Sequence, residues 1–384
     1  MFGQLALVVA AGLAGPLLAG GRRQLAPVVV GELAAGAFLG RTGFRLIDPT
    51  GSAFPTFYAL GFVMLMLTAG THVDLRSPEF RGGVKRAALA VALVFAGSLP
   101  AGWLVSHALS VQPFALFAVL VAGSSAAVAF PIIEERNLRG PGISLLIAWI
   151  ALADSFTVVL LPLTLVGTGK VAGALLGDAL IIAAGVATYL LAARVGHARR
   201  TKETWDRSRE RGWALQLRLS VILVLILATL AERTGASTLV AGFAAGMILV
   251  RLGEPGRLEV QISGVANGFF VPAFFVLLGA TLDLRALVTD PRAMLLAAVL
   301  ALAAVGVHVG AALLAGKSER VPTGMAASAQ LGLPAAAASL GLASHALSPA
   351  IAAAIVAAGC LTLVPASIGG ALLAGAPRPR ARKA

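Results

Sequence analysis

Ionisable side chains inside long apolar segments are the residues of this chain best placed to do chemistry. Asp154 lies within one residue of the centre of the apolar segment 142–168, which contains no basic residue to neutralise it. A charged side chain at the centre of a bilayer costs about 2.5–3.5 kcal/mol on insertion scales, and intramembrane carboxylates commonly mark ion or proton pathways. The position therefore predicts that Asp154 binds a proton or a cation. A buried structural carboxyl is the alternative interpretation.

Three further polar residues in apolar segments are candidate accessory groups. Glu32 lies in APVVVGELAAGAFLG, His308 in AAVGVHVGAALLAG and Gln330 in AQLGLPAAAASLGLAS. The small residues around Glu32 favour close helix packing as much as transport. A lone membrane histidine is more often a hydrogen-bonded core residue, although it can titrate near neutral pH. Packing roles and direct roles therefore both stay open for Glu32 and His308.

Two segments carry the signs of a helix interrupted within the membrane. GSSAAVAFPIIEE begins at Gly123 and contains Pro131, and AQLGLPAAAASLGLAS contains Gly332 and Pro334. An interrupted helix exposes backbone N–H and C=O groups, which is tolerated only where they line a cavity. Paired interruptions in corresponding places of two halves indicate a transporter site. Ordinary packing of Gly and Ala against neighbouring helices is the alternative.

The elements that position these residues are membrane-spanning helices. Hydrophobic residues make up 58% of the 384 residues and charged residues 12%, against about 25% charged in an average soluble domain. This composition excludes a soluble enzyme, a disordered chain and a secreted disulfide scaffold, and the one cysteine, Cys360, allows no internal disulfide. A spanning helix needs about 20 apolar residues. We predict thirteen spans, at 3–20, 24–40, 54–71, 84–109, 112–133, 142–168, 172–196, 213–232, 236–251, 260–280, 292–316, 321–344 and 348–374.

The basic residues predict the orientation of these helices. Most Lys and Arg residues fall on alternate connections, including the polar linker 197–212 and the basic tail 376–384. Under the positive-inside rule, this distribution predicts an N-terminus outside and a C-terminus in the cytoplasm. The net charge of +13 therefore reflects topology, and we expect no nucleic-acid partner. The fifth span enters from outside and the twelfth from inside, as an inverted repeat requires.

Four stretches resemble the cation:proton antiporter superfamily, in particular its bacterial sodium/proton and Kef-type potassium branch. They are PVVVGEL from Pro27, LGFVMLMLTAGTHVDL from Leu60, GSSAAVAFP from Gly123 and FFVPAFFVLLGATLDL from Phe269. Their order and spacing resemble the family over about residues 5–375. The resemblance implies an all-α polytopic membrane protein with inverted-topology repeats and two broken helices that cross beside the ion site.

The resemblance also implies a division of labour within residues 1–375. A dimerisation part would comprise about 1–75 and 213–285, and a core ion-translocation part about 84–168 and 292–374. The core would move as an elevator in a homodimer. Asp154 falls where the family has its ion-binding aspartate, and Ser124 and Ser125 fall in the first broken helix.

The sequence departs from the family pattern at two positions. Electrogenic members carry an Asp-Asp pair and a lysine in the eleventh span, whereas this chain has Ala153 before Asp154 and Val307 beside His308. One carboxylate holds either one proton or one monovalent cation. We therefore predict electroneutral exchange, unless His308 supplies a second proton.

A Na⁺ or K⁺ ion at Asp154 would take further oxygen ligands from Ser124, Ser125 or Ser155, from backbone carbonyls of the broken helix, or from water. No residue pattern calls for a cofactor. A cation-coupled organic-solute symporter, a channel and a non-transporting sensor or scaffold stay open as alternatives, and an enzyme is the least favoured class. Arg far outnumbers Lys, which is typical of a GC-rich coding sequence, and together with the family resemblance it predicts a bacterial inner membrane.

Overall fold

The fold is entirely helical in the part of the chain that a computed structural model describes. The described residues are 2–19, 28–49, 54–71, 78–126, 129, 132–133, 136, 138, 141–165, 171–196, 199–234, 238–252, 255–315 and 319–375. The helices are α1 (Phe2–Gly12), α2 (Ala14–Ala19), α3 (Val28–Leu39), α4 (Phe54–Thr71), α5 (Pro78–Leu109), α6 (Phe114–Ala122), α8 (Pro141–Leu165), α9 (Val171–Gly196), α10 (Arg199–Glu210), α11 (Leu215–Thr234), α12 (Thr238–Leu252), α13 (Pro255–Val265), α14 (Val271–Thr281), α15 (Leu284–Thr289), α16 (Pro291–Ala311), α17 (Arg320–Ala327), α18 (Gly332–Ala343) and α19 (Pro349–Gly375). A π-helical turn, η2 (Ala266–Phe270), joins α13 to α14, and a 3₁₀ turn, η3 (Ala312–Leu314), follows α16.

Nine helical stretches among the described residues are long and apolar enough to cross a membrane. They are Phe54–Thr71, Arg81–Leu109, Gly142–Leu165, Val171–Leu191, Leu215–Thr234, Val260–Thr281, Pro291–Leu314, Arg320–Ala343 and Pro349–Ala374. Shorter apolar helices occupy Phe2–Leu18, Val28–Leu39 and Thr238–Leu249, within or close to the predicted spans 3–20, 24–40 and 236–251. The remaining predicted span, 112–133, contains the short helix α6 and then a non-helical stretch. The multi-pass architecture is thus established, and the count of thirteen spans stays a prediction.

The described chain forms two compact units, and the first comprises Met1–Asp74, Val158–Met294 and Ala335–Ile355. Within it α12 packs on α4, and α14 packs on both α3 and α4. Glycine permits these close contacts, since a Cβ on Gly36 would lie 2.8 Å from the carbonyl carbon of Val276. Small residues at such positions let membrane helices approach backbone to backbone.

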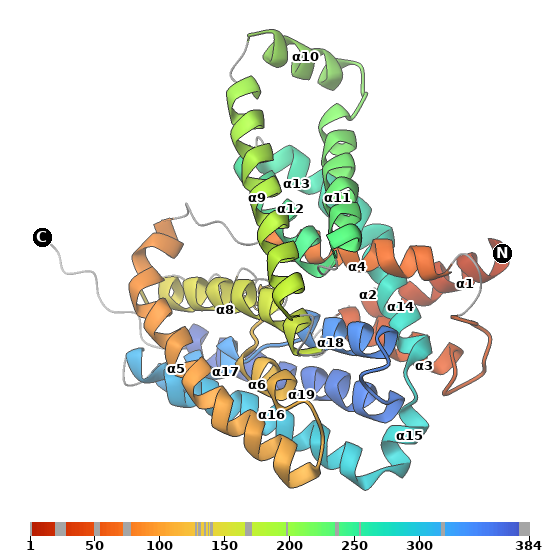
Figure 1. Cartoon of the computed structure of the whole chain (residues 1–384), viewed down its shortest axis with the longest axis vertical. Coiled ribbons are helices and arrows are strands. Elements are labelled where there is room, and N and C mark those ends of the chain that lie inside the picture. The colour runs from red at the N-terminus through yellow and green to blue at the C-terminus, as the bar shows by residue number, and fades with distance from the viewer. Residues whose placement is uncertain are drawn as a thin grey trace, which may run out of the picture. The chain divides into compact units, whose positions relative to one another are not determined.

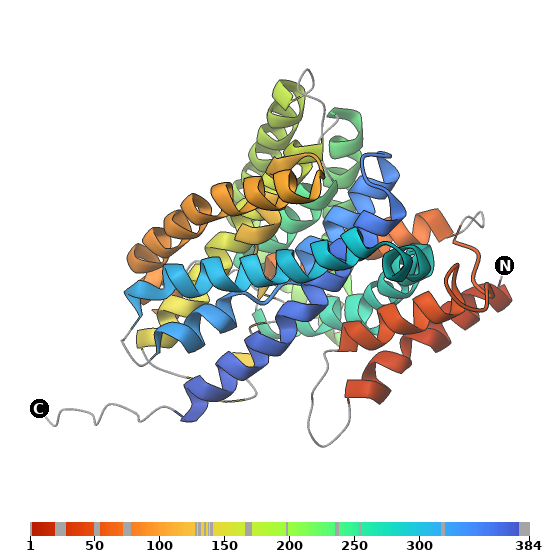
Figure 2. The same ribbon diagram turned by 90° about the horizontal axis from the view of Figure 1, so that it is seen from below.

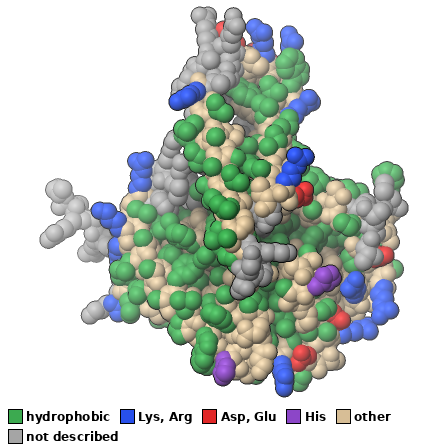
Figure 3. All heavy atoms as spheres, in the orientation of Figure 1, with side chains coloured by type: hydrophobic (Ala, Val, Ile, Leu, Met, Phe, Trp, Pro, Cys, Tyr) green, Lys and Arg blue, Asp and Glu red, His purple; other side chains and the backbone are tan. Residues whose placement is uncertain are grey.

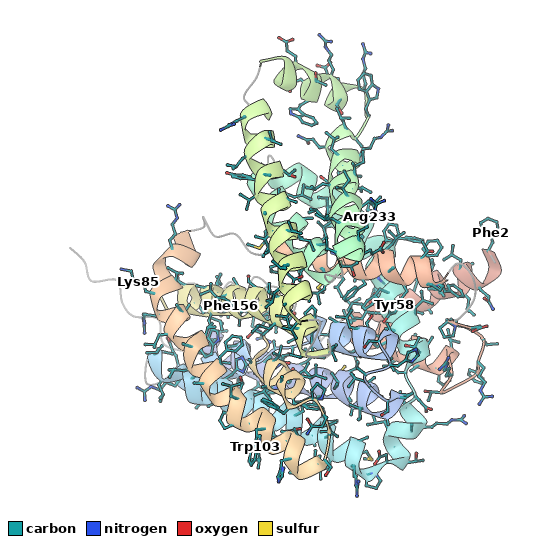
Figure 4. All side chains as sticks on the ribbon, viewed as in Figure 1. Phe2, Tyr58, Lys85, Trp103, Phe156 and Arg233 are labelled. Atoms are coloured by element: carbon teal, nitrogen blue, oxygen red, sulfur yellow. The ribbon has the colours of Figure 1, made fainter. Side chains whose placement is uncertain are left out.

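Two long helices of the first unit, α9 and α11, lie side by side and are joined at one end by the polar helix α10 (Figure 1). Apolar side chains cover the visible face of α9 and α11, and Lys and Arg side chains gather towards α10 (Figure 3). Arg233 stands at the opposite end of α11 from α10 (Figure 4). Apolar side chains along the middle of a helix, with charged residues near both ends, are typical of a helix exposed to lipid.

The second unit comprises Leu75–Thr157, Leu295–Pro334 and Val356–Ala384. Its helices α5 and α16 run side by side (Figures 1 and 2), and a Cβ on Gly97 would lie 3.2 Å from the side chain of Val307. The ring of Phe156 on α8 meets Phe95 on α5 edge to face at 6.3 Å, on the stretch of α5 between Lys85 and Trp103 (Figure 4). The two units do not by themselves identify the predicted dimerisation and core parts, so that division stays a prediction.

Candidate ion-binding site

The first break in the second unit follows α6, whose last residue is Ala122. Gly123 is extended, with φ −64° and ψ 147°, and its N–H donates to the carbonyl of Leu120 at 3.3 Å. Ser124 and Ser125 are also non-helical, and helical backbone begins again at Ala126. The non-helical stretch therefore begins at Gly123. Pro131, which was expected to contribute to it, lies outside the described residues.

The second break comprises Ser328–Leu331, between α17 and α18. Ser328 satisfies two carbonyls at the end of α17, because its N–H donates to Gly324 at 3.0 Å and its hydroxyl to Met325 at 2.8 Å. Gly332 and Pro334 were expected at the interruption and instead lie in the first turn of α18. Proline is tolerated there because the first N–H groups of a helix have no intrahelical acceptor.

The two breaks contact each other directly. The hydroxyl of Ser124, in the first break, donates a hydrogen bond to the carbonyl of Ala327, the last residue of α17, at 2.7 Å. The side chain of Gln330, in the second break, lies against Gly123, where an added Cβ would be 3.3 Å from Oε1. Polar groups of both interruptions thus meet in one place, buried among apolar helices.

The carboxylate of Asp154 lies beside the point where helical backbone resumes after the first break. Its Oδ2 accepts a hydrogen bond from the N–H of Ala126 at 3.1 Å, and the residue is only 6% exposed. This N–H precedes any intrahelical acceptor, so the carboxylate satisfies a group that the break leaves free. Among the described residues, no basic side chain forms an ion pair with Asp154.

His308 links three elements around the first break. Its Nδ1 lies 2.8 Å from the carbonyl of Ala304 on its own helix, and its Nε2 lies 3.2 Å from the hydroxyl oxygen of Ser124. The imidazole also stacks on Trp149 of α8, with ring centroids 5.8 Å apart and an interplanar angle of 8°. His308 is fully buried, so these contacts account for its polar atoms.

The other candidate residues have different surroundings. Ser125 is buried in the first break, whereas the hydroxyl of Ser155 donates to the carbonyl of Ala151 in its own helix at 2.7 Å. Gln330 is buried, and its Nε2 has no hydrogen-bond partner among the residues that the structure describes. Glu32 belongs to the first unit and packs against Gly15, and its buried Oε2 has no hydrogen-bond partner within the described ranges. The structure thus brings Ser124 and His308, both of the second unit, into contact, whereas Glu32 belongs to the first unit.

Four groups that form contacts around the two breaks were not predicted from the sequence. They are the N–H of Ala126, the carbonyl of Ala327, the indole of Trp149 and the hydroxyl of Thr362. The first two are backbone groups, which carry no signal in residue type. Trp149 and Thr362 lie inside predicted spans, where each reads as an ordinary core residue.

The donor set favours a singly charged, oxygen-seeking ion. Within the described ranges, no three His, Cys, Asp or Glu side chains are grouped closely enough to hold a metal ion. Among the described residues whose polar groups meet at the two breaks, Asp154 contributes the carboxylate, and the other oxygens are hydroxyls and carbonyls. One carboxylate with neutral oxygen ligands balances one unit of positive charge.

Replacing Thr362 by Val is expected to destabilise the second break. The hydroxyl of Thr362 accepts the N–H of Gln330 at 3.1 Å and donates to the carbonyl of Gly359 at 2.7 Å. Valine has the same shape but leaves the buried N–H unsatisfied, which costs about 1–3 kcal/mol. Thermal unfolding of the purified protein should show a lower Tm for Thr362→Val and a smaller change for Thr362→Ser. Equal effects of the two substitutions would contradict this role of the hydroxyl.

Comparison with protein families gives one match that covers nearly the whole chain. Residues 7–374 match the model of the family described as sodium/hydrogen exchanger, transmembrane. A similar protein is YjbQ of Bacillus subtilis (strain 168), whose name assigns it provisionally as a Na⁺/H⁺ antiporter. It is 27% identical over 295 residues, which cover 72% of this chain and 47% of YjbQ.

Another similar protein is the glutathione-regulated potassium-efflux system protein KefC of Enterobacter sp. (strain 638). It is 27% identical over 281 residues, covering 70% of this chain and 43% of KefC. The matched part of the chain thus spans less than half the length of these relatives. The solved sodium proton antiporter MjNhaP1 from Methanocaldococcus jannaschii has the same fold, with a TM-score of 0.64, 17% identity, and coverage of 97% of this chain and 96% of that one.

Proposed function

The chain belongs to the sodium/hydrogen exchanger family, which consists of transporters rather than enzymes, and from this premise we propose that it exchanges Na⁺ or K⁺ for protons across a membrane. The observation that carries the proposal is the buried carboxylate of Asp154. It lies beside the contact of two broken helices and accepts a hydrogen bond from one backbone N–H among the described residues. The names of the relatives support both ions as candidates.

Proton and cation compete for the same carboxylate in the proposed mechanism. A bare carboxylate in a desolvated site is costly unless a positive partner neutralises it. Either a proton or a monovalent cation supplies that partner at Asp154. Release of one therefore favours binding of the other, and this competition couples the two fluxes.

The exchange is electroneutral in this proposal. Asp154 follows Ala153 rather than a second carboxylate, and Val307 precedes His308 where electrogenic relatives carry a lysine. One carboxylate that holds one proton or one monovalent cation carries the same charge in both crossings. The membrane potential then exerts no net force on the cycle.

The movement of the core part across the membrane is coupled to neutralisation of Asp154 in this proposal. A core part with inverted-topology repeats and crossing broken helices moves as an elevator against the dimerisation part of a homodimer. Moving an unpaired carboxylate through the bilayer would be strongly opposed by desolvation, so only the neutralised core crosses. We place the transporter in a bacterial inner membrane with its N-terminus outside and its C-terminus in the cytoplasm, where such exchange serves pH homeostasis.

Proton flux into or out of proteoliposomes tests this proposal. The purified chain is reconstituted with a pH-sensitive dye inside, Na⁺, K⁺ or Li⁺ is added outside, and empty liposomes serve as the control. We expect cation-triggered proton flux whose rate is the same with the membrane potential clamped or free. Flux that follows the potential would overturn electroneutrality. No flux with any of the three cations would favour a solute symporter or a non-transporting relative.

A further inference from the structure

The hydroxyl of Ser124 has one proton and two acceptors within reach. The carbonyl oxygen of Ala327 lies 2.7 Å away and the Nε2 atom of His308 lies 3.2 Å away. A serine hydroxyl donates one hydrogen bond at a time. The hydroxyl therefore donates its hydrogen bond either to the carbonyl of Ala327 or to Nε2 of His308. Donation to His308 requires that Nε2 has a free lone pair.

The contacts of His308 indicate that Nε2 is an acceptor. Nδ1 faces the carbonyl of Ala304 at 2.8 Å, and a carbonyl only accepts, so Nδ1 carries the hydrogen. The imidazole is fully buried against Trp149 and, among the described residues, has no carboxylate partner that would stabilise a second proton. A neutral ring with hydrogen on Nδ1 leaves the lone pair of Nε2 directed at Ser124.

The carbonyl of Ala327 loses its hydrogen bond from Ser124 when this hydroxyl turns to His308, and regains it when the hydroxyl turns back. It is the last carbonyl of α17, so the helix itself provides no N–H for it. Ser328 satisfies the carbonyls of Gly324 and Met325, whereas the carbonyl of Ala327 accepts, among the described residues, the hydroxyl of Ser124 from the other break. Carbonyls at the C-terminal ends of interrupted helices are established ligands for Na⁺ in transporters.

We propose that Ser124 and His308 form a hydroxyl switch that exposes the carbonyl of Ala327 to the transported cation. Without cation, the hydroxyl of Ser124 donates to Ala327. When the cation binds at Asp154, the hydroxyl turns to Nε2 of His308, and the oxygens of Ser124 and Ala327 become neutral ligands. No proton leaves the site in this rotation, so the switch agrees with electroneutral exchange. It rests on the proposed function and makes His308 a positioning residue.

A double-mutant cycle tests the switch in proteoliposomes. The variants are His308→Leu, Ser124→Ala and the two combined, and the measurement is the KM for Na⁺ or K⁺ in proton exchange alongside kcat. Removing the acceptor should raise KM roughly 3- to 10-fold, the equivalent of one hydrogen bond, with a smaller effect on kcat. In the Ser124→Ala background, His308→Leu should change KM less than twofold, because no hydroxyl remains to be held.

Two further experiments distinguish the switch from a purely structural packing role of His308. His308→Gln keeps an acceptor oxygen near the position of Nε2 and should restore part of the cation affinity lost in His308→Leu. If a variant at His308 fails to fold, ¹⁵N NMR of the imidazole provides an independent test. Adding Na⁺ or K⁺ should shift the Nε2 signal in the wild type, as expected for an acceptor gaining a hydrogen bond, and should leave it unchanged in Ser124→Ala.

The switch and the proposed function fail in different ways. The switch is wrong if His308→Leu raises KM by the same factor in the wild type and in Ser124→Ala, or if adding the cation does not shift the Nε2 signal. Either result is compatible with exchange at Asp154. If the wild type shows no cation-triggered flux, or if flux survives loss of the carboxylate of Asp154, the proposed function fails and the switch fails with it.

Discussion

Replacing Asp154 by Asn is expected to abolish cation-dependent proton exchange while leaving the fold intact. The amide oxygen of Asn can still accept the N–H of Ala126, now 3.1 Å from Oδ2, so the hydrogen bond that fixes the residue survives. The charge does not survive. Truncating one partner of a buried ionic contact costs about 2–5 kcal/mol, which corresponds to a roughly 30- to 4,000-fold loss of cation affinity. Dye-reported proton flux should fall to the level of empty liposomes.

A matched control is available at Asp178 on α9. It is also a buried aspartate in an apolar helix, and it belongs to the first unit. Asp178→Asn removes the same charge and should retain most of the exchange, with any loss appearing in stability instead. Near-normal exchange in a well-folded Asp154→Asn protein would contradict the assignment of Asp154 as the ion-binding carboxylate.

The membrane segments were predictable because bilayer thickness imposes length and apolarity on every spanning helix. Segments such as 54–71 coincide with helix α4, Phe54–Thr71, since nothing but a helix satisfies its backbone in lipid. Helix interruptions were only partly predictable. The run of small residues that begins at Gly123 lies at the first non-helical stretch. Pro334, in contrast, lies a few residues after the second non-helical stretch, Ser328–Leu331, because proline also fits the first turn of a helix.

The contacts within the candidate site were beyond sequence reasoning for a physical reason. Asp154 is recognisable because an isolated charge in an apolar segment is costly wherever it lies. The contact of Ser124 with His308 joins residues 184 positions apart, and its partner at Ala327 is a backbone oxygen. Such contacts depend on how the helices pack, which a single sequence does not specify. The roles of these residues as ion ligands stay predictions.

Adding a single methyl group at Gly324 is expected to separate the two helices that carry His308 and Ala327. A Cβ at this position would lie 2.7 Å from the backbone nitrogen of Val309 and 2.8 Å from the carbonyl oxygen of His308. Both atoms belong to the backbone of α16, so no flexible side chain can move aside. Overpacking of this kind typically costs about 1–3 kcal/mol. Gly324→Ala should therefore lower the Tm in detergent and reduce exchange, because α16 and α17 must move apart.

Gly310 provides the matched control for Gly324, since it lies on the same helix, α16, as Val309. An added Cβ there would meet nothing within 4 Å, and Ala is more favourable than Gly inside a helix by about 1 kcal/mol. Gly310→Ala should keep exchange and keep or raise the Tm. Equal tolerance of both substitutions would show that α16 and α17 are not held at the distance the structure gives. In that case the proposed choice of the Ser124 hydroxyl between two acceptors would lose its geometric basis, because α17 carries the carbonyl of Ala327 while α16 carries His308.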